Sequence, residues 1–515
     1  MRNRLALWCC AGVVIAANAA AQAPVSAPLN VIDWLDAQPT PSTPVALPAP
    51  SEPAVADSAR VPSVTVAPLD GEAPKRVGLA PATVTGLPDT LWSGTDGRAL
   101  AQQVRDMPEL RVPALQSLFY TLLLAEALPP ADNAADFDLA RVTALADVGA
   151  LEPALALMEQ ANPTQNAAHF ARYMDLSLLT GTENAACATL RAMPALSPGK
   201  AHEVFCAARA GDWDTAVLQL GTSRVLGLID ETQASALERF LDPELYEGEA
   251  ALPVPSRPDA LLFRLYQAIG TPVPTRVWPV VYANADLADT AGWKARIEAA
   301  ERLARHGALP ENRLLGILTH RQPAASGGVW DRVSAVQRFE TALRTGSPTA
   351  ISKTLPTAWR HMRKARLAVP FASLFAEDLS KIVLSGPSAD IAFDMLLVSA
   401  SYESAAQVFP ARALRHPLAT AVAAGSAPAD TTPLIGTAQA IGAAFADAPP
   451  DASLIAMAQD GALGDALLRT IALTQLGGAG DVAQLTTGLA TLRALGLEDV
   501  ARRTALQVLL LEDTQ

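Results

Sequence analysis

The sequence predicts an all-α protein, an irregular α-solenoid of antiparallel helix pairs that follows a disordered, proline-rich tether. Half of the 515 residues are hydrophobic, but only 5% are aromatic. Abundant Ala and Leu favour helices, because these side chains lose little entropy there, whereas strands prefer β-branched and aromatic residues. The other two observations are a proline-rich stretch near the start and helical spacing of apolar residues beyond it.

The first 21 residues have the three parts of a secretory signal. Arg2 and Arg4 precede an apolar run, and Ala19-Ala20-Ala21 supplies small residues for a signal peptidase. We therefore predict a signal peptide over residues 1–21. The alternative is an uncleaved anchor, because residues 5–21 are just long enough to cross a thin bilayer. Together with a composition rich in Ala, Pro, Leu and Arg, this signal suggests a Gram-negative bacterium, so we expect the periplasm.

Residues 22–90 are predicted to be a linker. Proline recurs through this stretch, and it removes a backbone donor and disfavours the interior of both helices and sheets. A short apolar motif over residues 29–36 interrupts the pattern, with Ile32, Trp34 and Leu35 as its main side chains. The motif either docks on a partner and folds there or packs on the protein's own helical region.

From residue 91 onward, the pattern is helix, short turn, helix. Residues 136–148 form one such segment, Gly149-Ala150 forms the turn, and the next helix has apolar residues at i, i+3, i+4 and i+7: Leu151, Ala154, Leu155 and Met158. A helix that ends at Gly and restarts at once implies antiparallel neighbours. Proline-rich or small-residue stretches at 252–258 and 424–433 divide the array into three predicted sections, 91–250, 258–424 and 434–515.

A turn signature recurs between helices. The segments around Gly149, Gly307 and Gly461 share a Gly-Ala-Leu core, and the segment around Gly211 is a looser relative. This signature resembles the joint between the two helices of tetratricopeptide-type repeats. The resemblance implies paired helices that present an extended surface to a partner. The copies are irregularly spaced and lack the 34-residue consensus of that family, so a degenerate array is expected, with an irregular helix bundle as the alternative.

Cys187 and Cys206 are predicted to form a disulfide. Residues 183–193 and 200–210 read as two short helices, and both cysteines lie nearly the same distance from the turn between them. They would therefore face each other in an antiparallel hairpin, and an oxidising compartment favours their pairing. The alternative is two buried free thiols.

No motif predicts a catalytic or metal site, and we expect no cofactor. The six histidines are scattered, no phosphate-binding glycine loop follows a strand, and no nucleophile elbow is complete. Soluble lytic transglycosylases share an exported helical superhelix, but the Glu-Ser and Gly-Leu-Met-Gln pattern of their catalytic domain is missing from this sequence. A net charge of −13 disfavours nucleic acid as a partner.

The loop over residues 322–332 contains the candidate interaction site. Gly327 and Gly328 allow close approach of another backbone, and Trp330, Asp331 and Arg332 follow them. Trp and Arg dominate binding hot spots. The alternative is that Trp330 packs into the helix that follows.

A basic run follows Trp359 and consists of Arg360, His361, Arg363, Lys364 and Arg366. It either contacts a glycan, an acidic protein or a lipid headgroup, or forms a helix face paired with local acids.

We therefore expect a non-enzymatic periplasmic scaffold that binds an envelope protein. Contact with the membrane is expected only through the signal or an uncleaved anchor. The alternative function is a glycan-active enzyme or a peptidoglycan-binding protein with an unrecognised site. An enzyme of that kind would have two carboxylates within about 10 Å of each other.

Overall fold

The computed structural model describes residues 75–257, 259–426 and 434–511, which form an all-α solenoid of packed helix pairs. Extended pairing among these residues is limited to two isolated bridges, Val77 with Ala127 and Ala80 with Ala125. The fold class predicted from composition and apolar spacing is therefore confirmed.

The first half of the array ends with the eight-residue 3-10 segment η3. Its elements are α2 (Ala82–Thr85), α3 (Gly97–Arg105), α4 (Pro113–Leu124), α5 (Ala134–Asp147), α6 (Leu151–Gln160), α7 (Ala167–Thr180), α8 (Glu183–Ala192), η1 (Pro194–Leu196), α9 (Lys200–Arg209), α10 (Trp213–Val225), α11 (Glu231–Leu241), α12 (Ala260–Ala268), η2 (Thr275–Val277) and η3 (Val280–Leu287).

The second half continues with α13 (Trp293–Arg305), α14 (Glu311–Thr319), α15 (Val329–Arg344), α16 (Pro348–Lys364), α17 (Ala368–Ser380), α18 (Gly386–Val398), η4 (Tyr402–Ser404), α19 (Ala405–Val408), α20 (Pro410–Ala413), α21 (Pro417–Ala423), α22 (Gly436–Phe445), α23 (Ala452–Gln459), α24 (Leu463–Gly478), α25 (Val482–Ala494) and α26 (Glu498–Leu511).

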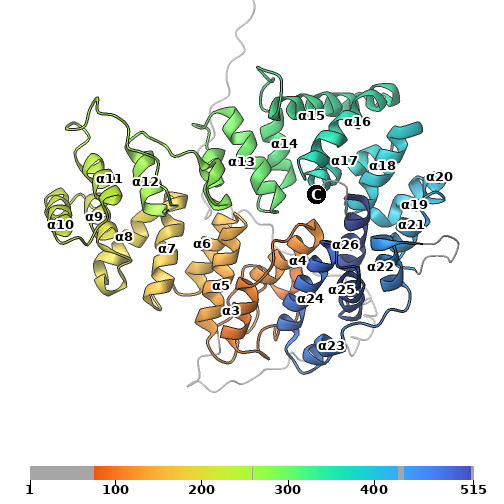
Figure 1. The fold of residues 1–515 in the computed structure, drawn as a ribbon, viewed down its shortest axis with the longest axis horizontal. Coiled ribbons are helices and arrows are strands. Elements are labelled where there is room, and N and C mark those ends of the chain that lie inside the picture. The colour runs from red at the N-terminus through yellow and green to blue at the C-terminus, as the bar shows by residue number, and fades with distance from the viewer. Residues whose placement is uncertain (1–74, 258, 427–433, 512–515) are drawn as a thin grey trace, which may run out of the picture. The chain divides into compact units, whose positions relative to one another are not determined.

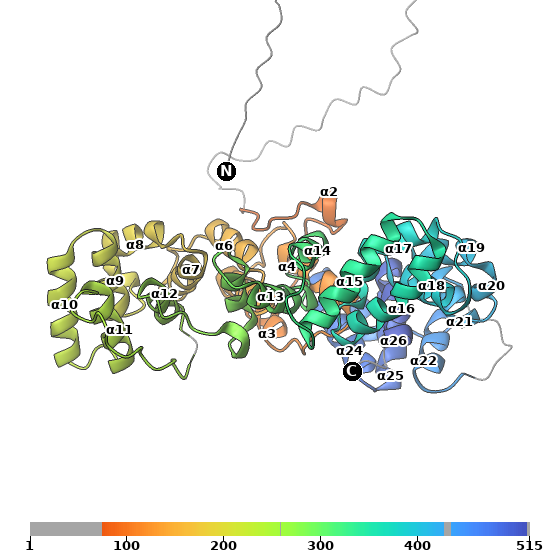
Figure 2. The same ribbon diagram turned by 90° about the horizontal axis from the view of Figure 1, so that it is seen from above.

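The helices pack in chain order, as in a solenoid, and at two places the chain folds back and packs on earlier helices. Consecutive helices pack together from α5 to α12 and from α13 to α18, and several also touch the next helix but one, such as α9 with α11 and α13 with α15. At the first of these places, α12 packs on α7 and η3 contacts α5 and α7. At the second, α24 and α26 pack on α4. Figures 1 and 2 show both series of helices.

The four turns of the recurring signature share one backbone arrangement. Gly149, Gly211, Gly307 and Gly461 all have positive φ, between 71° and 92°. In each case the residue after the glycine donates its N–H to the carbonyl five residues earlier, for example Ala150 to Leu145. This is the Schellman ending, which glycine adopts at no steric cost because it lacks Cβ.

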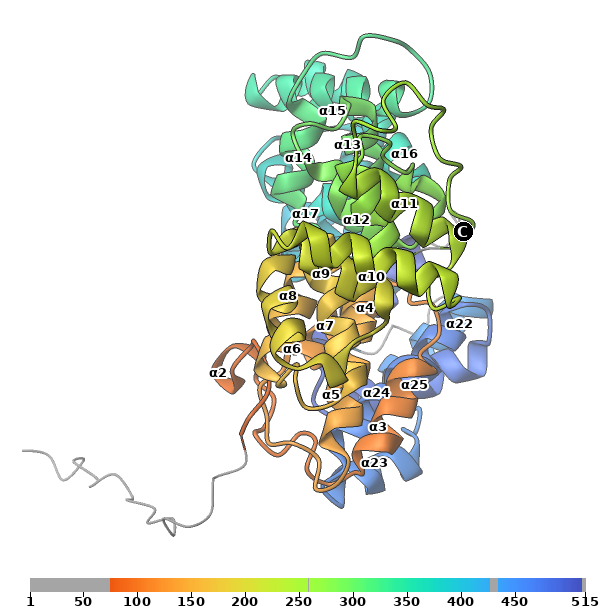
Figure 3. The ribbon, with the colours of Figure 1, turned by 90° about the vertical axis from the view of Figure 1, so that its left-hand side faces the viewer.

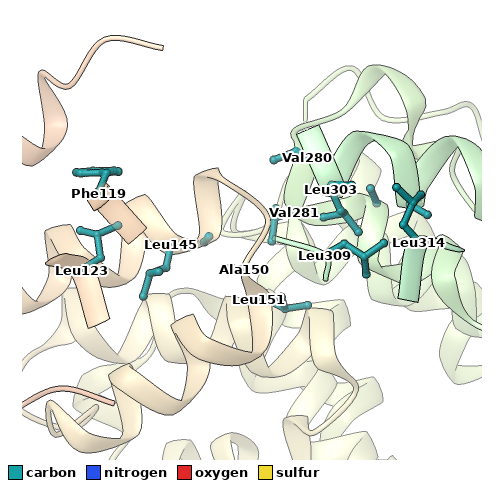
Figure 4. Packing of buried hydrophobic residues seen from close by; sticks show 14 of the residues in the cluster. Phe119, Leu123, Leu145, Ala150, Leu151, Val280, Val281, Leu303, Leu309 and Leu314 are labelled. Atoms are coloured by element: carbon teal, nitrogen blue, oxygen red, sulfur yellow. The ribbon is translucent and has the colours of Figure 1, made fainter. Parts of the chain in front are cut away.

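The turn after α5 also joins the two halves of the array. A Cβ on Gly149 would lie 2.6 Å from Leu303 Cδ2, and Asn284 Nδ2 donates to the Gly149 carbonyl at 2.9 Å. Apolar side chains from α5–α6 and from η3–α14 flank this contact, as Figure 4 shows for Leu145, Leu151, Val280 and Leu303. Glycine at position 149 therefore allows both the left-handed turn and the close approach of Leu303.

Two buried glutamines tie the C-terminal helices to the start of α4. Gln475 Oε1 accepts from the Arg111 N–H at 2.9 Å, and Gln507 Oε1 accepts from the Ala114 N–H at 2.8 Å. Because α4 has no capping side chain of its own, the bond from Ala114 satisfies an amide that its first turn leaves open, and the bond from Arg111 holds the segment just before the helix. Figure 1 shows α24 and α26 beside α4.

Residues 75–80, at the end of the predicted linker, are held against the helices. Arg141 is fully buried on α5 and donates to the carbonyls of Val77, Leu123 and Ala125 at 2.9 to 3.0 Å. Val77 is itself buried. A buried guanidinium requires acceptors, and this extended segment supplies one of the three carbonyls, while Asp138 pairs with the same guanidinium at 3.4 Å.

The predicted disulfide is present between α8 and α9. Cys187 and Cys206 are bonded, with their Cα atoms 5.0 Å apart, and both are buried. The helices run from Glu183 to Ala192 and from Lys200 to Arg209, close to the predicted bounds. The spacing argument for an antiparallel hairpin is therefore confirmed.

The signal peptide over 1–21 and the motif with Ile32, Trp34 and Leu35 lie outside the described residues. The division into sections 91–250, 258–424 and 434–515 stays a prediction. Within the described part of the chain, no helix combines the length and hydropathy that a membrane crossing requires.

Candidate functional site

The loop predicted as the interaction site borders an open groove of about 740 Å³. The groove runs along α15 to the start of α16, and loop residues Gln322, Pro323, Ala325 and Ser326 form one rim. Gly327 and Gly328 are exposed, and both have positive φ. Gly327 donates its N–H to Asp331 Oδ1 at 2.9 Å, which fixes the loop at the start of α15.

Trp330 and Arg332 have structural contacts in this region. The Trp330 ring packs on Trp293 of α13, with ring centroids 5.1 Å apart, and it is partly buried. Arg332 forms a bidentate ion pair with Glu301, which is 2% exposed, and Arg305 donates to the same carboxylate at 3.3 Å. Part of the unusual composition of the Trp-Asp-Arg segment therefore serves the contact between α13 and α15.

The lining of the groove is mostly polar and uncharged. Hydroxyl and amide side chains predominate, and they come from Ser326, Ser334, Gln337, Thr341, Thr345 and Thr354. Asp331 is the carboxylate among the lining residues, and it is engaged by the Gly327 N–H. Such a surface can exchange hydrogen bonds with a polar polymer, but its lining lacks the pair of carboxylates expected for glycoside cleavage.

A second candidate surface is the exposed face of α10, which the sequence reasoning missed. Val217, Leu218 and Val225 are 59%, 70% and 88% exposed, and Trp213 at the start of the helix is also exposed. Ala216, Leu220 and Ser223 form the buried face, against α9 and α11. Figure 3 shows α10 in front of these two helices.

Gly221 lies in the middle of this apolar face. A Cβ at this position would meet nothing within 4 Å, so no contact inside the described chain requires a glycine here. Glycine inside a helix costs about 1 kcal/mol relative to Ala. The exposed apolar side chains at 213, 217 and 225 have the spacing of one helical face, a pattern that a buried face shows equally, so no signal in the sequence marks this face as exposed.

Acidic side chains lie at the start of α10 and on the neighbouring α11 and its following turn. Asp212 and Asp214 are exposed at the start of α10. Arg224 is paired with Glu231 and Glu238 of α11, so its positive charge is compensated. The turn after α11 contains the exposed Glu244, Glu247 and Glu249, of which Glu249 pairs with Arg239 at 3.3 Å. Asp212 and Asp214 therefore give the start of the apolar face a negative charge.

A cavity of about 300 Å³ lies where the first helices meet the α13–α14 turn. Its apolar lining includes Met107, Phe119 and Leu123, and its polar lining includes Tyr120, Asp147 and His306. Burial raises the pKa of Asp147 and of Tyr120. Burial, with Arg366 as the next cause, lowers the pKa of His306, which favours its neutral form. A cavity of this kind can hold a small apolar group.

Among the described residues, no three His, Cys, Asp or Glu side chains are placed together as a metal site would require. Comparison of the chain with protein-family models, with curated proteins and with solved structures found no match.

Proposed function

We propose that this protein is a non-enzymatic scaffold of the bacterial cell envelope, exported to the periplasm, that binds a protein partner through the exposed face of α10. The observation that carries the proposal is the apolar stripe of Trp213, Val217, Leu218 and Val225 on a helix whose opposite face is already packed. Contiguous exposed apolar surface on a folded protein marks interaction sites.

The partner that fits is an amphipathic helix with basic residues beside its apolar face. Gly221 leaves room in the middle of the stripe for a second helix to approach closely. The exposed acids at the start of α10, Asp212 and Asp214, would attract basic side chains and orient the incoming helix. The degenerate tetratricopeptide-like character of the array supports the same function, because such arrays present helix surfaces to partners.

The test is affinity capture from native envelopes after cross-linking, with wild-type protein, Leu218→Glu and Val225→Glu. Substitutions at exposed positions change stability by about 0.5 kcal/mol or less, so both variants are expected to fold. Each should reduce recovery of a stoichiometric partner by about tenfold or more, as loss of a hot-spot residue does. Val383→Glu is the matched control, because Val383 is 90% exposed in the loop after α17.

Equal recovery with wild type and both α10 variants would refute the proposed surface. Binding to purified peptidoglycan without any protein partner would refute the scaffold function itself. Deletion of residues 22–70 leaves the described residues intact, and it tests separately whether the motif over 29–36 contributes to capture.

A second candidate function is binding of peptidoglycan in the groove along α15. Its lining of mostly hydroxyl and amide side chains, with the partly exposed Trp330 at one end, is the observation that favours it. Sedimentation with purified sacculi tests this function. Ser334→Arg and Thr341→Arg would block the groove and should abolish co-sedimentation, whereas Leu218→Glu should not.

A further inference from the structure

Three arginines from the basic run and from the α3–α4 loop meet in a small pocket. Arg111, Arg363 and Arg366 line a cavity of about 60 Å³, together with the first residues of α17 and the end of α26. A single water needs about 10–15 Å³ of such space, so the pocket can hold a group of several non-hydrogen atoms. No carboxylate is among its lining residues in the described chain.

Within residues 75–257, 259–426 and 434–511, the positive charge in this pocket is only partly compensated. Arg111 pairs with Glu109 at 3.0 Å, and Arg363 donates to the Leu510 carbonyl at 3.2 Å. In the described chain, neither Arg363 nor Arg366 has a carboxylate within ion-pair distance, although Arg363 attracts Asp394 and Arg366 attracts Glu109. The local acids that would have paired with the basic run are therefore not in contact with these two arginines.

Two buried donors at the pocket have no acceptor in the described chain. Gln507 is 2% exposed, and its Nε2 is without a hydrogen-bond partner, as is Arg363 Nε. The orientation of the Gln507 amide is fixed, because its Oε1 accepts from the Ala114 N–H. A buried donor without an acceptor is costly, and a bound acceptor would remove that cost.

The backbone adds to the same preference for an anion. Ala368 and Val369 line the pocket as the first residues of α17, a helix of 13 residues with neither a capping side chain nor an acid in its first turn. Free N–H groups and the helix dipole make such an end favourable for an anion.

Arg366 itself has φ 55°, the left-handed conformation that glycine adopts in the equivalent turns. Arginine in this left-handed conformation costs backbone strain, and it places a guanidinium at the pocket.

We propose that this pocket is a binding site for a phosphate group, either free or carried on a small organic molecule. Arginines bind phosphate oxygens with paired N–H donors, and Gln507 Nε2 supplies a neutral donor beside them. Because the lining residues come from the α3–α4 loop, α16, α17 and α26, the bound phosphate links the start of the array to its end. Binding therefore stabilises the fold in proportion to occupancy.

The test measures the midpoint of thermal unfolding of the full mature chain in 0 to 10 mM inorganic phosphate, with sodium chloride added to keep ionic strength constant. Low phosphate concentrations avoid the general stabilisation that phosphate produces by exclusion from protein surfaces. We expect the midpoint to rise by about 2 °C or more and to saturate. Broadening of the phosphate ³¹P signal by the protein provides a direct measure of binding.

Two variants separate binding from folding. Arg366→Gly removes a charge but relieves the backbone, so the phosphate-free midpoint should stay level or rise while the phosphate-dependent shift is lost. Gln507→Glu keeps the Oε1 acceptor for Ala114 and replaces the Nε2 donor with an oxygen, which should abolish the shift. Arg415→Gln is the matched control, because Arg415 is an exposed arginine away from the pocket, and it should retain the full shift.

Additional probes identify the source of the phosphate. A larger shift with glycerol 3-phosphate than with inorganic phosphate supports an organic phosphate as ligand, and the reverse supports the free ion. An equal shift with acetate would overturn the assignment in favour of a general carboxylate site. Absence of saturation and of ³¹P broadening, or an undiminished shift in both Arg366→Gly and Gln507→Glu, would overturn the site.

Discussion

Replacement of Arg332 tests whether the Trp-Asp-Arg segment holds the array together. Both Arg332 nitrogens that face α13 donate to the carboxylate of Glu301, and Arg305 is the other partner of that carboxylate. Removing one partner of a buried ion pair typically costs about 3–5 kcal/mol, because the remaining charge stays buried and uncompensated. Since Arg305 retains one bond to Glu301, we expect Arg332→Met to lower the free energy of unfolding by about 3 kcal/mol.

The matched variants are Glu301→Leu and the double variant Glu301→Leu with Arg332→Met. An apolar pair of similar volume should recover most of the loss, to within about 1 kcal/mol of wild type, because the charges of Glu301 and Arg332 are both removed and Arg305 keeps its bond to the Ala365 carbonyl. The assay is urea unfolding followed by circular dichroism, with the double-mutant cycle giving the coupling energy. The structural role of Arg332 would be refuted if Arg332→Met kept its stability within about 0.5 kcal/mol of wild type but lost partner capture. Arg332 would then act in recognition.

Three further predictions concern the disulfide, a buried carboxyl and a close helix contact. Cys187 and Cys206 are 19 residues apart, and reduction of their disulfide should lower the free energy of unfolding by about 3 kcal/mol. The measurement compares thermal unfolding with reductant and without it. A Cys187→Ala, Cys206→Ala protein should no longer respond to reductant. Burial raises the pKa of the Asp175 carboxyl from 3.8 to about 6. The native state therefore binds a proton at Asp175 more tightly than the unfolded state does, and the stability that this proton contributes is lost as pH rises from about 4 to about 6. Asp175→Asn should therefore gain up to about 3 kcal/mol over wild type at pH 7 and little at pH 4, and parallel pH profiles of the two proteins would contradict this. A Cβ on Gly477 would lie 2.2 Å from the Leu485 backbone nitrogen, so Gly477→Ala should lower the free energy of unfolding by about 1–3 kcal/mol. Gly316 is an exposed helical glycine with nothing within 4 Å of a Cβ, so Gly316→Ala should raise the free energy of unfolding by up to about 1 kcal/mol in the same assay.

Local patterns in the sequence predicted local structure well. Gly149, Gly211, Gly307 and Gly461 end their helices in the left-handed conformation, because no other residue adopts it as cheaply. Leu151, Ala154 and Met158 are buried as their spacing indicates. Leu155 is only partly buried, and Leu157 takes its place in the core, because the contacting neighbours decide which edge of an apolar face is covered.

The candidate surfaces were less accessible to sequence reasoning. The loop over 322–332 borders a groove, but Arg332 forms an ion pair with Glu301, which lies 31 positions away in the chain. The apolar spacing on α10 resembles that of a core face, and only the packing of Ala216 and Leu220 on α9 and α11 leaves Leu218 and Val225 exposed. A pattern of apolar residues gives the face of a helix but not the presence of a partner for it.

The sequence by itself determined the helical class, the turns and the disulfide, because each depends on residues close together in the chain. The tertiary structure alone decided where the two halves meet and which charges remain uncompensated. Arg111, Arg366 and Gln507 belong to three distant parts of the sequence, and they line one pocket only because α26 packs on α4. Distant pairings of this kind follow from how buried surfaces fit in three dimensions, and a linear pattern carries no information on that fit.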